Sequence, residues 1–165
     1  GGAVLNQSYV LVRNDVAVMG PEGPAGGFGV SDTGNYGGSH DASINSVHWW
    51  TARLKKTEKV EVIVVKSVEG HTPNLIKFAN IPPPPTGKAA HLPIMPSDAD
   101  PHTVYTYTGP VAGAVTGTSN NLTFTFNPPI EINAIVISAS VQMRLFAVKL
   151  YRPAPETDEP GTIVP

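Results

Sequence analysis

Several polar residues lie where strand-like segments of the chain give way to loops. Sugar recognition needs flat apolar side chains for C–H groups, and hydrogen-bond donors and acceptors for hydroxyls. His48 and Lys66 could donate, a cationic donor giving the stronger hydrogen bond, and Glu69 could accept. We predict a ligand site here, and the alternative is a set of exposed loop residues with no shared target. The predicted ligand-binding residues are His48, Lys66, Glu69, His71 and Asn74.

Oxygen-bearing side chains also gather in a glycine-rich segment. Calcium takes roughly six to eight oxygen ligands, which Asp32, Asn35 and Asp41 could begin to supply. Gly34 and Gly37 would let backbone carbonyls turn inward as further ligands. The alternative is an ordinary turn held by Asx hydrogen bonds. Calcium is the one cofactor that the sequence suggests.

Acid–base chemistry has few candidates in this chain. The sequence has no nucleophile elbow, no HExxH motif and no phosphate-binding loop. Asp98 and Asp100 could bind a metal together with His91 or His102 if the loop at 82–102 folded over. We favour the alternative, in which this loop is flexible and polar and binds no metal. We therefore expect that the protein is not an enzyme. The residues weighed for such chemistry are His40, Asp41, His91, Asp98, Asp100 and His102.

Composition favours one all-β domain. The length of 165 residues fits a single domain with a substantial core. Charged residues make up only 15%, hydrophobic residues 41%, and the chain has 16 glycines and 17 prolines. Low charge combined with many turn formers and many Val, Ile and Thr residues is typical of β-sheet domains.

The same figures exclude several classes of function. A formal charge of −2 provides no basic field for nucleic acid or for anionic lipid. Cysteine is absent, which rules out disulfides, a thiol nucleophile and cysteine-ligated zinc. No apolar run reaches the roughly 18–20 residues that a membrane span needs. We expect neither a nucleic-acid partner nor a membrane span.

The only two tryptophans, Trp49 and Trp50, stand side by side at the start of a strand pattern. Neighbouring side chains in a strand point to opposite faces, so one indole should enter the core and the other should stay near the surface. A structural role for both is the favoured interpretation, and an exposed binding tryptophan is the alternative.

Alternating apolar residues and turn signals predict a set of short strands. A Lys-Lys-Thr-Glu-Lys turn should separate residues 49–54 from 60–66, and long loops are expected at 20–48 and 82–102. Pro82 to Pro85 is a polyproline stretch, interpreted as a stiff connector rather than a ligand for an aromatic groove. We predict a sandwich domain over residues 1–152 and an extended tail over 153–165. The expected strands are 3–13, 16–18, 49–54, 60–66, 74–81, 103–108, 111–116, 122–126, 134–138 and 143–151.

Five segments, in order, resemble the discoidin (coagulation factor 5/8 type C) and fucolectin family of galactose-binding-like domains. They include an N-x-A-x-G opening, a loop rich in Gly, Asp and Asn, a Trp-Trp strand and a closing strand that ends in Tyr. The resemblance covers roughly residues 14–151 and implies an antiparallel β-sandwich of the galactose-binding-like jelly-roll type with long loops. The matching segments are residues 14–20, 32–38, 49–54 with 60–65, 127–130 with 134–137, and 145–151.

The chain departs from this family at its site positions. The family's strand aspartate falls on Arg53, and the arginine that grips fucose in fucolectins falls on Val68. Ala147 replaces the glutamate that helps to hold calcium. Fucolectins place a histidine before the Trp pair, and here His40 and His48 are both available. A resemblance that keeps core positions and loses site positions supports the fold more than the activity.

The resemblance implies a non-catalytic, lectin-like binding or adhesion module that recognises glycans or a surface partner through loops at one end of the sandwich. The lost site residues favour a second interpretation, a structural subunit or decoration module of an extracellular filament or virion. Either interpretation implies an extracellular location, or one on a particle or cell surface, within a larger assembly. The two N-glycosylation sequons, Asn6-Gln7-Ser8 and Asn121-Leu122-Thr123, slightly favour a secreted protein.

Overall fold

The computed structural model describes residues 9–11, 16–20, 23–24, 47–83 and 94–153. Strands dominate these residues, and all strand pairs are antiparallel. The two helical turns in this part of the chain, α2 and η1, are far too short to cross a bilayer. The elements are β1 (Tyr9–Leu11), β2 (Val16–Gly20), β3 (Gly23–Pro24), β4 (Val47–Ser67), β5 (Leu75–Ala79), α2 (Pro96–Ala99), η1 (Asp100–His102), β6 (Thr103–Tyr107), β7 (Val115–Thr118), β8 (Asn121–Met143) and β9 (Leu145–Pro153).

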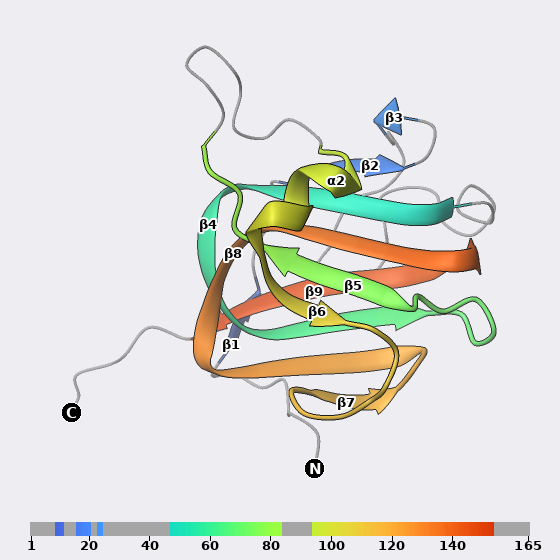
Figure 1. Cartoon of the computed structure of the whole chain (residues 1–165). Coiled ribbons are helices and arrows are strands. Elements are labelled where there is room, and N and C mark those ends of the chain that lie inside the picture. Colours follow the sequence, from blue (N-terminus) through green and yellow to red (C-terminus); the bar gives the residue numbers. More distant parts are fainter. Residues whose placement is uncertain (1–8, 12–15, 21–22, 25–46, 84–93, 154–165) are drawn as a thin grey trace.

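Two long strands, β4 and β8, pair with each other along most of their length and bend together, as Figure 1 shows. Their bend divides the strands into two layers. Layer 1 contains β2, the first half of β4, the second half of β8, then β5 and β6. Layer 2 contains β1, β9, the second half of β4, the first half of β8, then β7. The predicted all-β antiparallel sandwich is confirmed.

The turn predicted between residues 49–54 and 60–66 is wrong, because β4 continues through it without reversing. The segment has no Gly, Pro, Asn or Asp to reverse the chain, and the pairing register only shifts between Arg53 and Glu58. Likewise, the predicted strands 122–126 and 134–138 are two halves of β8. Each long strand therefore contributes to both layers.

The core lies between the layers and is filled by alternate residues of both. Trp50 is 1% exposed and enters the core, whereas Trp49 is half-buried, so the predicted division of the two indoles is confirmed. The largest core residues from layer 1 are Trp50, Ile76, Phe78, Ile135 and Ile137, and those from layer 2 include Ile63, Leu122, Phe124 and Leu150.

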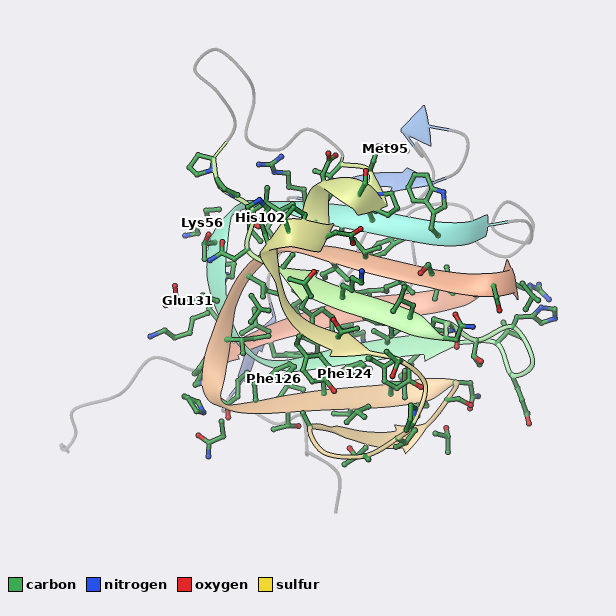
Figure 2. The ribbon with its side chains drawn as sticks, viewed as in Figure 1. Lys56, Met95, His102, Phe124, Phe126 and Glu131 are labelled. Atoms are coloured by element: carbon green, nitrogen blue, oxygen red, sulfur yellow. The ribbon has the colours of Figure 1, made fainter. Side chains whose placement is uncertain are left out.

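Aromatic rings close the side of the core beneath β6. Phe124 and Phe126 of β8 lie between that strand and β6 (Figure 2). Phe124 stands edge-on to Phe78 and Tyr107, with ring centroids 5.1 and 5.7 Å apart, and Phe126 lies 5.1 Å from Tyr105. Such edge-to-face pairs add to the stabilisation from burial. They fix β6 firmly to layer 2.

The outer face of layer 1 is covered by residues 80–83 and 94–102, which we call the covering segment. Figure 1 shows α2 lying across the sheet. A small apolar cluster of Ala79, Ala134 and Val136 with Ile94 and Ala99 lies beneath it. The predicted loop 82–102 is therefore wrong at its C-terminal part, where Pro96 opens a helix that is too short to show helical periodicity.

Buried polar side chains hold the covering segment by its backbone. Thr51 Oγ1 donates to the Ile94 carbonyl at 2.7 Å, and Arg53 donates to the Pro82 carbonyl at 3.4 Å. The Asn133 side chain both donates to the Ile81 carbonyl and accepts from its N–H, each at 2.8 Å. These contacts give Arg53 a structural role in place of the aspartate expected there from the resemblance.

The sandwich has two dissimilar ends. At the bend end, residues 55–59 of β4 and 127–133 of β8 cross between the layers, and Lys56, His102 and Glu131 lie there (Figure 2). At the loop end, β4 begins and finishes, β8 turns into β9, and residues 68–74 connect β4 to β5. All five predicted ligand-binding residues belong to the loop end.

Candidate functional site

A backbone hydrogen-bond frame organises the loop end. The Val68 N–H donates to the Arg144 carbonyl at 2.9 Å, and the Arg144 N–H donates to the His71 carbonyl at 3.0 Å. The His71 N–H closes the turn by donating to the Val68 carbonyl at 2.9 Å. The loop after β4 is therefore fastened to the β8–β9 turn, which gives its side chains defined positions.

The frame holds part of the predicted site together. His71 is half-buried within the framed loop, and Glu69 is exposed at its tip. Asn74 is exposed, and its Nδ2 donates to the Ser140 hydroxyl at 3.0 Å. His48 belongs to β4 next to Val47, which pairs with Met143, so its backbone reaches the same end; its side chain lies outside the described set.

Lys66 takes a different direction from Asn74. Along the second half of β4, Ile63 and Val65 point into the core, so Lys66 projects from the outer face of layer 2. Asn74 instead contacts Ser140 next to layer 1. The two residues therefore belong to the same end of the sandwich but to different layers.

A feature that the sequence did not indicate lies on the outer face of layer 1. Ser138 of β8 pairs in register with Trp49 on one side and with Leu75 on the other. Directly opposite residues project from the same face, with Cβ atoms about 5 Å apart. All three are half-buried, so a small hydroxyl-bearing residue lies between two large apolar side chains. We call this row the Trp49–Leu75 trough.

The trough adjoins the framed loop. The Asn74 N–H donates to the Ser138 carbonyl at 3.0 Å, and the Asn74 side chain reaches Ser140 two residues along β8. No hydrogen bond from the Trp49 indole N–H occurs among the described residues. The trough therefore combines an indole, an amide and two hydroxyls at one edge of the sheet.

Arg144 and Ser67 are further residues that the sequence analysis missed. Arg144 is a half-buried cation at the centre of the frame, and its signal in the sequence was a single charge between the apolar Met143 and Leu145. Ser67 is 3% exposed, and within the part of the chain that the structure describes its hydroxyl has no hydrogen-bond partner. Its orientation follows that of Val65, toward the interior of the loop end.

The predicted calcium ligands Asp32, Asn35 and Asp41 lie outside the described residues, as do His40 and His91. Over residues 47–83 and 94–153, and the short strands before them, no group of three His, Asp or Glu side chains could hold a metal ion. The calcium site therefore stays a prediction.

The acidic residues near α2 have structural partners. The Asp98 carboxylate accepts the Met95 N–H at 2.8 Å, which caps the helix, and Lys77 Nζ forms an ion pair with Asp100 at 2.8 Å. The His102 carbonyl accepts the Asn80 N–H at 3.0 Å. The Lys77–Asp100 ion pair ties this segment to β5, and Asp98 and Asp100 both have structural partners.

No family model matches this chain, and no curated protein matches it. Among solved structures, the chain is similar to the F5/8 type C domain of a Bacteroides fragilis protein, at 12% identity and a TM-score of 0.46. The likeness covers 91% of this chain and 100% of that chain. That domain carries the family description that residues 14–151 resemble in sequence. The strand pairing shows the antiparallel sandwich without reference to that structure.

Proposed function

We propose that this protein is a non-catalytic binding module that recognises glycans at the layer 1 side of the loop end, on the surface of a cell or particle or in the extracellular space. The observation that carries the proposal is the Trp49–Leu75 trough beside the Asn74–Ser140 pair. The site includes part of the predicted set, with Asn74 at its edge and His71 and Glu69 in the adjoining loop.

The chemistry of the trough suits a pyranose ring. The half-buried Trp49 indole offers an apolar face on which the C–H side of a sugar can stack. The Ser138 hydroxyl donates to the Leu75 carbonyl at 3.4 Å, and the Ser140 hydroxyl accepts from Asn74 at 3.0 Å. A sugar hydroxyl could still donate to the Ser138 oxygen or to the Asn74 amide oxygen, and could accept from the Ser140 hydroxyl. Glu69, exposed at the tip of the framed loop, adds a charged acceptor.

Rigidity supports the same proposal. Trp49, Leu75 and Ser138 sit on paired strands, and the backbone frame fixes the loop that contains His71. A site on rigid elements loses little conformational entropy when it binds a ligand. Weak individual sugar contacts then suffice for measurable affinity.

The absence of catalysis is part of the proposal. The carboxylates of Asp98 and Asp100 have structural partners, and the Lys77 that pairs with Asp100 lies on the outer face of layer 1, two residues along β5 from Leu75. General acid–base catalysis needs such groups within hydrogen-bond reach of a substrate. The described acidic residues provide no such pair at the trough.

A glycan array with the purified protein, with and without calcium, is the first experiment. For a glycan that binds, Trp49→Ala and Asn74→Ala should each weaken affinity at least about tenfold, about 1.4 kcal/mol, measured by calorimetry. Lys66→Ala is the matched control, because Lys66 projects from the opposite outer face. Absence of binding to every glycan with calcium present would refute the proposal, and loss of binding in Lys66→Ala alone would move the site to layer 2.

A structural subunit or decoration module of an extracellular filament or virion is the second candidate. That function requires a surface through which copies associate. Residues 103–130, which form β6, β7 and the first half of β8, contain no charged side chain. Because depletion of charge is typical of the centre of protein interfaces, this observation favours the second candidate.

A further inference from the structure

The Trp49–Leu75 trough has a direction, because its residues form one row across three strands. Trp49 of β4 lies opposite Ser138 of β8, and Ser138 lies opposite Leu75 of β5. Neighbouring strands lie about 4.8 Å apart, so the backbones of Trp49 and Leu75, two strands apart, are separated by about 10 Å. One pyranose ring is shorter than this distance, whereas two linked rings span it.

The next row of the sheet toward the bend end is closed. It consists of Thr51, Val136 and Lys77, which lie opposite one another in the same three strands. Thr51 and Val136 are only 0% and 3% exposed, although they project from the outer face of layer 1, because the covering segment lies over them. A ligand in the trough therefore cannot extend along the strands toward the bend end.

The covering segment crosses the strands in the same direction as the trough. At β4 the Ile94 carbonyl accepts from Thr51 Oγ1 at 2.7 Å, and at β5 the Asp100 carboxylate pairs with Lys77 Nζ at 2.8 Å. Between these two contacts α2 lies across the sheet (Figure 1). Residues 94–100, which we call the wall, therefore border one long side of the trough.

The other long side of the trough has hydrogen-bonding groups in place of a wall. Asn74 is exposed there, and its Nδ2 donates to the Ser140 hydroxyl at 3.0 Å. Among the described residues, no hydrogen bond to the Asn74 amide oxygen occurs. The trough is thus one row wide, and a ligand that contacts both Trp49 and Leu75 must lie across the strands, alongside these polar groups.

We propose that the ligand of the trough is an oligosaccharide of at least two linked pyranose rings, which lies across β4, β8 and β5 parallel to the wall. One ring stacks on the Trp49 indole, and the next ring contacts Leu75. This inference rests on the proposed function and names the class of glycan that the site binds.

Two contacts on paired strands make the affinity depend on the length of the sugar. Once the first ring is bound at Trp49, the second ring meets Leu75 without a second loss of translational freedom. Strand pairing holds both residues in place, so the second contact orders little additional chain. A disaccharide should therefore bind much more tightly than either of its single rings.

Calorimetry with matched mono- and disaccharides, and NMR titration for the weaker ligands, tests this inference. The probes are glucose, galactose, mannose and N-acetylglucosamine with their α- and β-linked disaccharides, and the terminal mono- and disaccharide of any glycan that binds on the array. For a sugar that binds, the disaccharide should have at least about tenfold higher affinity than its monosaccharide, the gain expected from one additional apolar contact.

Two substitutions separate the two ends of the trough. Leu75→Ala should weaken disaccharide binding at least about tenfold and leave monosaccharide binding unchanged, whereas Trp49→Ala should weaken both. Leu75→Met keeps an apolar side chain of similar size and should retain most of the affinity. Val104→Ala is the matched control, because Val104 is an aliphatic residue of β6 that is 47% exposed and lies outside the trough. Thermal unfolding monitored by circular dichroism verifies that the variants are folded.

The outcomes distinguish this inference from the proposed function. A monosaccharide that binds as tightly as its disaccharide would overturn the two-ring arrangement and leave glycan binding at Trp49 intact. Disaccharide affinity that is unchanged in Leu75→Ala, or reduced equally in Val104→Ala, would overturn it in the same way. Absence of binding to every glycan would refute the proposed function and this inference together.

Discussion

Asn133 at the bend end and Asn74 at the loop end belong to the same layer, and their side chains are used differently. Asn133 is 8% exposed, and its amide makes two hydrogen bonds of 2.8 Å to the backbone of Ile81. Asn74 is exposed, and its amide makes one hydrogen bond of 3.0 Å to Ser140. The first side chain joins two segments of backbone, and the second keeps an acceptor free for other molecules.

The same difference holds for the charged residues of the two ends. At the bend end Arg152 forms an ion pair with Glu58 at 3.2 Å, and Lys59 stands opposite Glu131 in the register of β4 and β8. At the loop end Lys66 and Glu69 are exposed, and neither has an ion-pair partner within the described residues.

This contrast has a structural cause. At the bend end both long strands pass from one layer to the other, so their polar groups must be satisfied where the regular pairing is interrupted. At the loop end the chain reverses in loops, and the hydrogen bonds that connect Val68, His71 and Arg144 run between backbone groups. Side chains at the loop end are therefore available for a ligand, which is why we place the binding function there.

Asn133→Ala should give the largest effect on stability. The substitution removes both hydrogen bonds to the half-buried backbone N–H and C=O of Ile81, which we expect to lower the free energy of unfolding by about 2 kcal/mol. Urea denaturation followed by tryptophan fluorescence measures the change. Asn133→Asp keeps the acceptor and loses the donor, so it should retain part of the stability. If Asn133→Ala is as stable as wild type, the covering segment is held by other contacts and the comparison of the two ends fails.

A buried side chain near the loop end gives an intermediate effect. Tyr107 is 2% exposed, and its hydroxyl donates to the Gly109 carbonyl at 2.8 Å. Tyr107→Phe should therefore cost about 1 kcal/mol of unfolding free energy at neutral pH. Tyr105→Phe is the matched control, because no hydrogen bond of the Tyr105 hydroxyl occurs in the described part of the chain. An equal cost for both variants would contradict the assignment.

The same tyrosines predict a pH dependence. Burial raises the pKa of Tyr105, and burial together with the neighbouring Tyr105 raises the pKa of Tyr107. As the pH rises, the unfolded chain loses these protons first, so the folded protein has its full stability below the ordinary pKa of 10.0 and loses stability above it. Unfolding midpoints measured between neutral and alkaline pH should fall above this value, and less steeply in Tyr105→Phe. A steeper fall in that variant would be contrary to this expectation.

Local sequence patterns predicted where strands lie and which of the two tryptophans is buried. Residues 60–66 and 74–81 were both predicted as strands; 60–66 lie within β4, and β5 covers 75–79. Because adjacent side chains of a strand point in opposite directions, the burial of Trp50 and partial exposure of Trp49 followed from their adjacency alone.

Long-range features could not be predicted in this way. Residues 55–59 contain three lysines, a pattern that predicts a turn, yet here they cross between layers because β8 bends alongside them. That crossing puts Lys66 on layer 2, which separates it from Asn74. The Trp49–Leu75 trough depends on the register of three strands that are distant in sequence, and no local pattern specifies such a register.

Exposed residues of the loop end should show the smallest effects on stability. Glu69→Gln and Asn74→Ala should each change the free energy of unfolding by less than about 0.5 kcal/mol, because solvent replaces the contacts that they lose. Comparing urea denaturation with glycan affinity in the same variants separates the two roles. Asn74→Ala should weaken binding without weakening the fold, whereas Asn133→Ala should do the reverse. If Asn74→Ala instead costs about 2 kcal/mol or more, its bond to Ser140 is structural, and the loop end would be built like the bend end, with its polar side chains used to hold the backbone together.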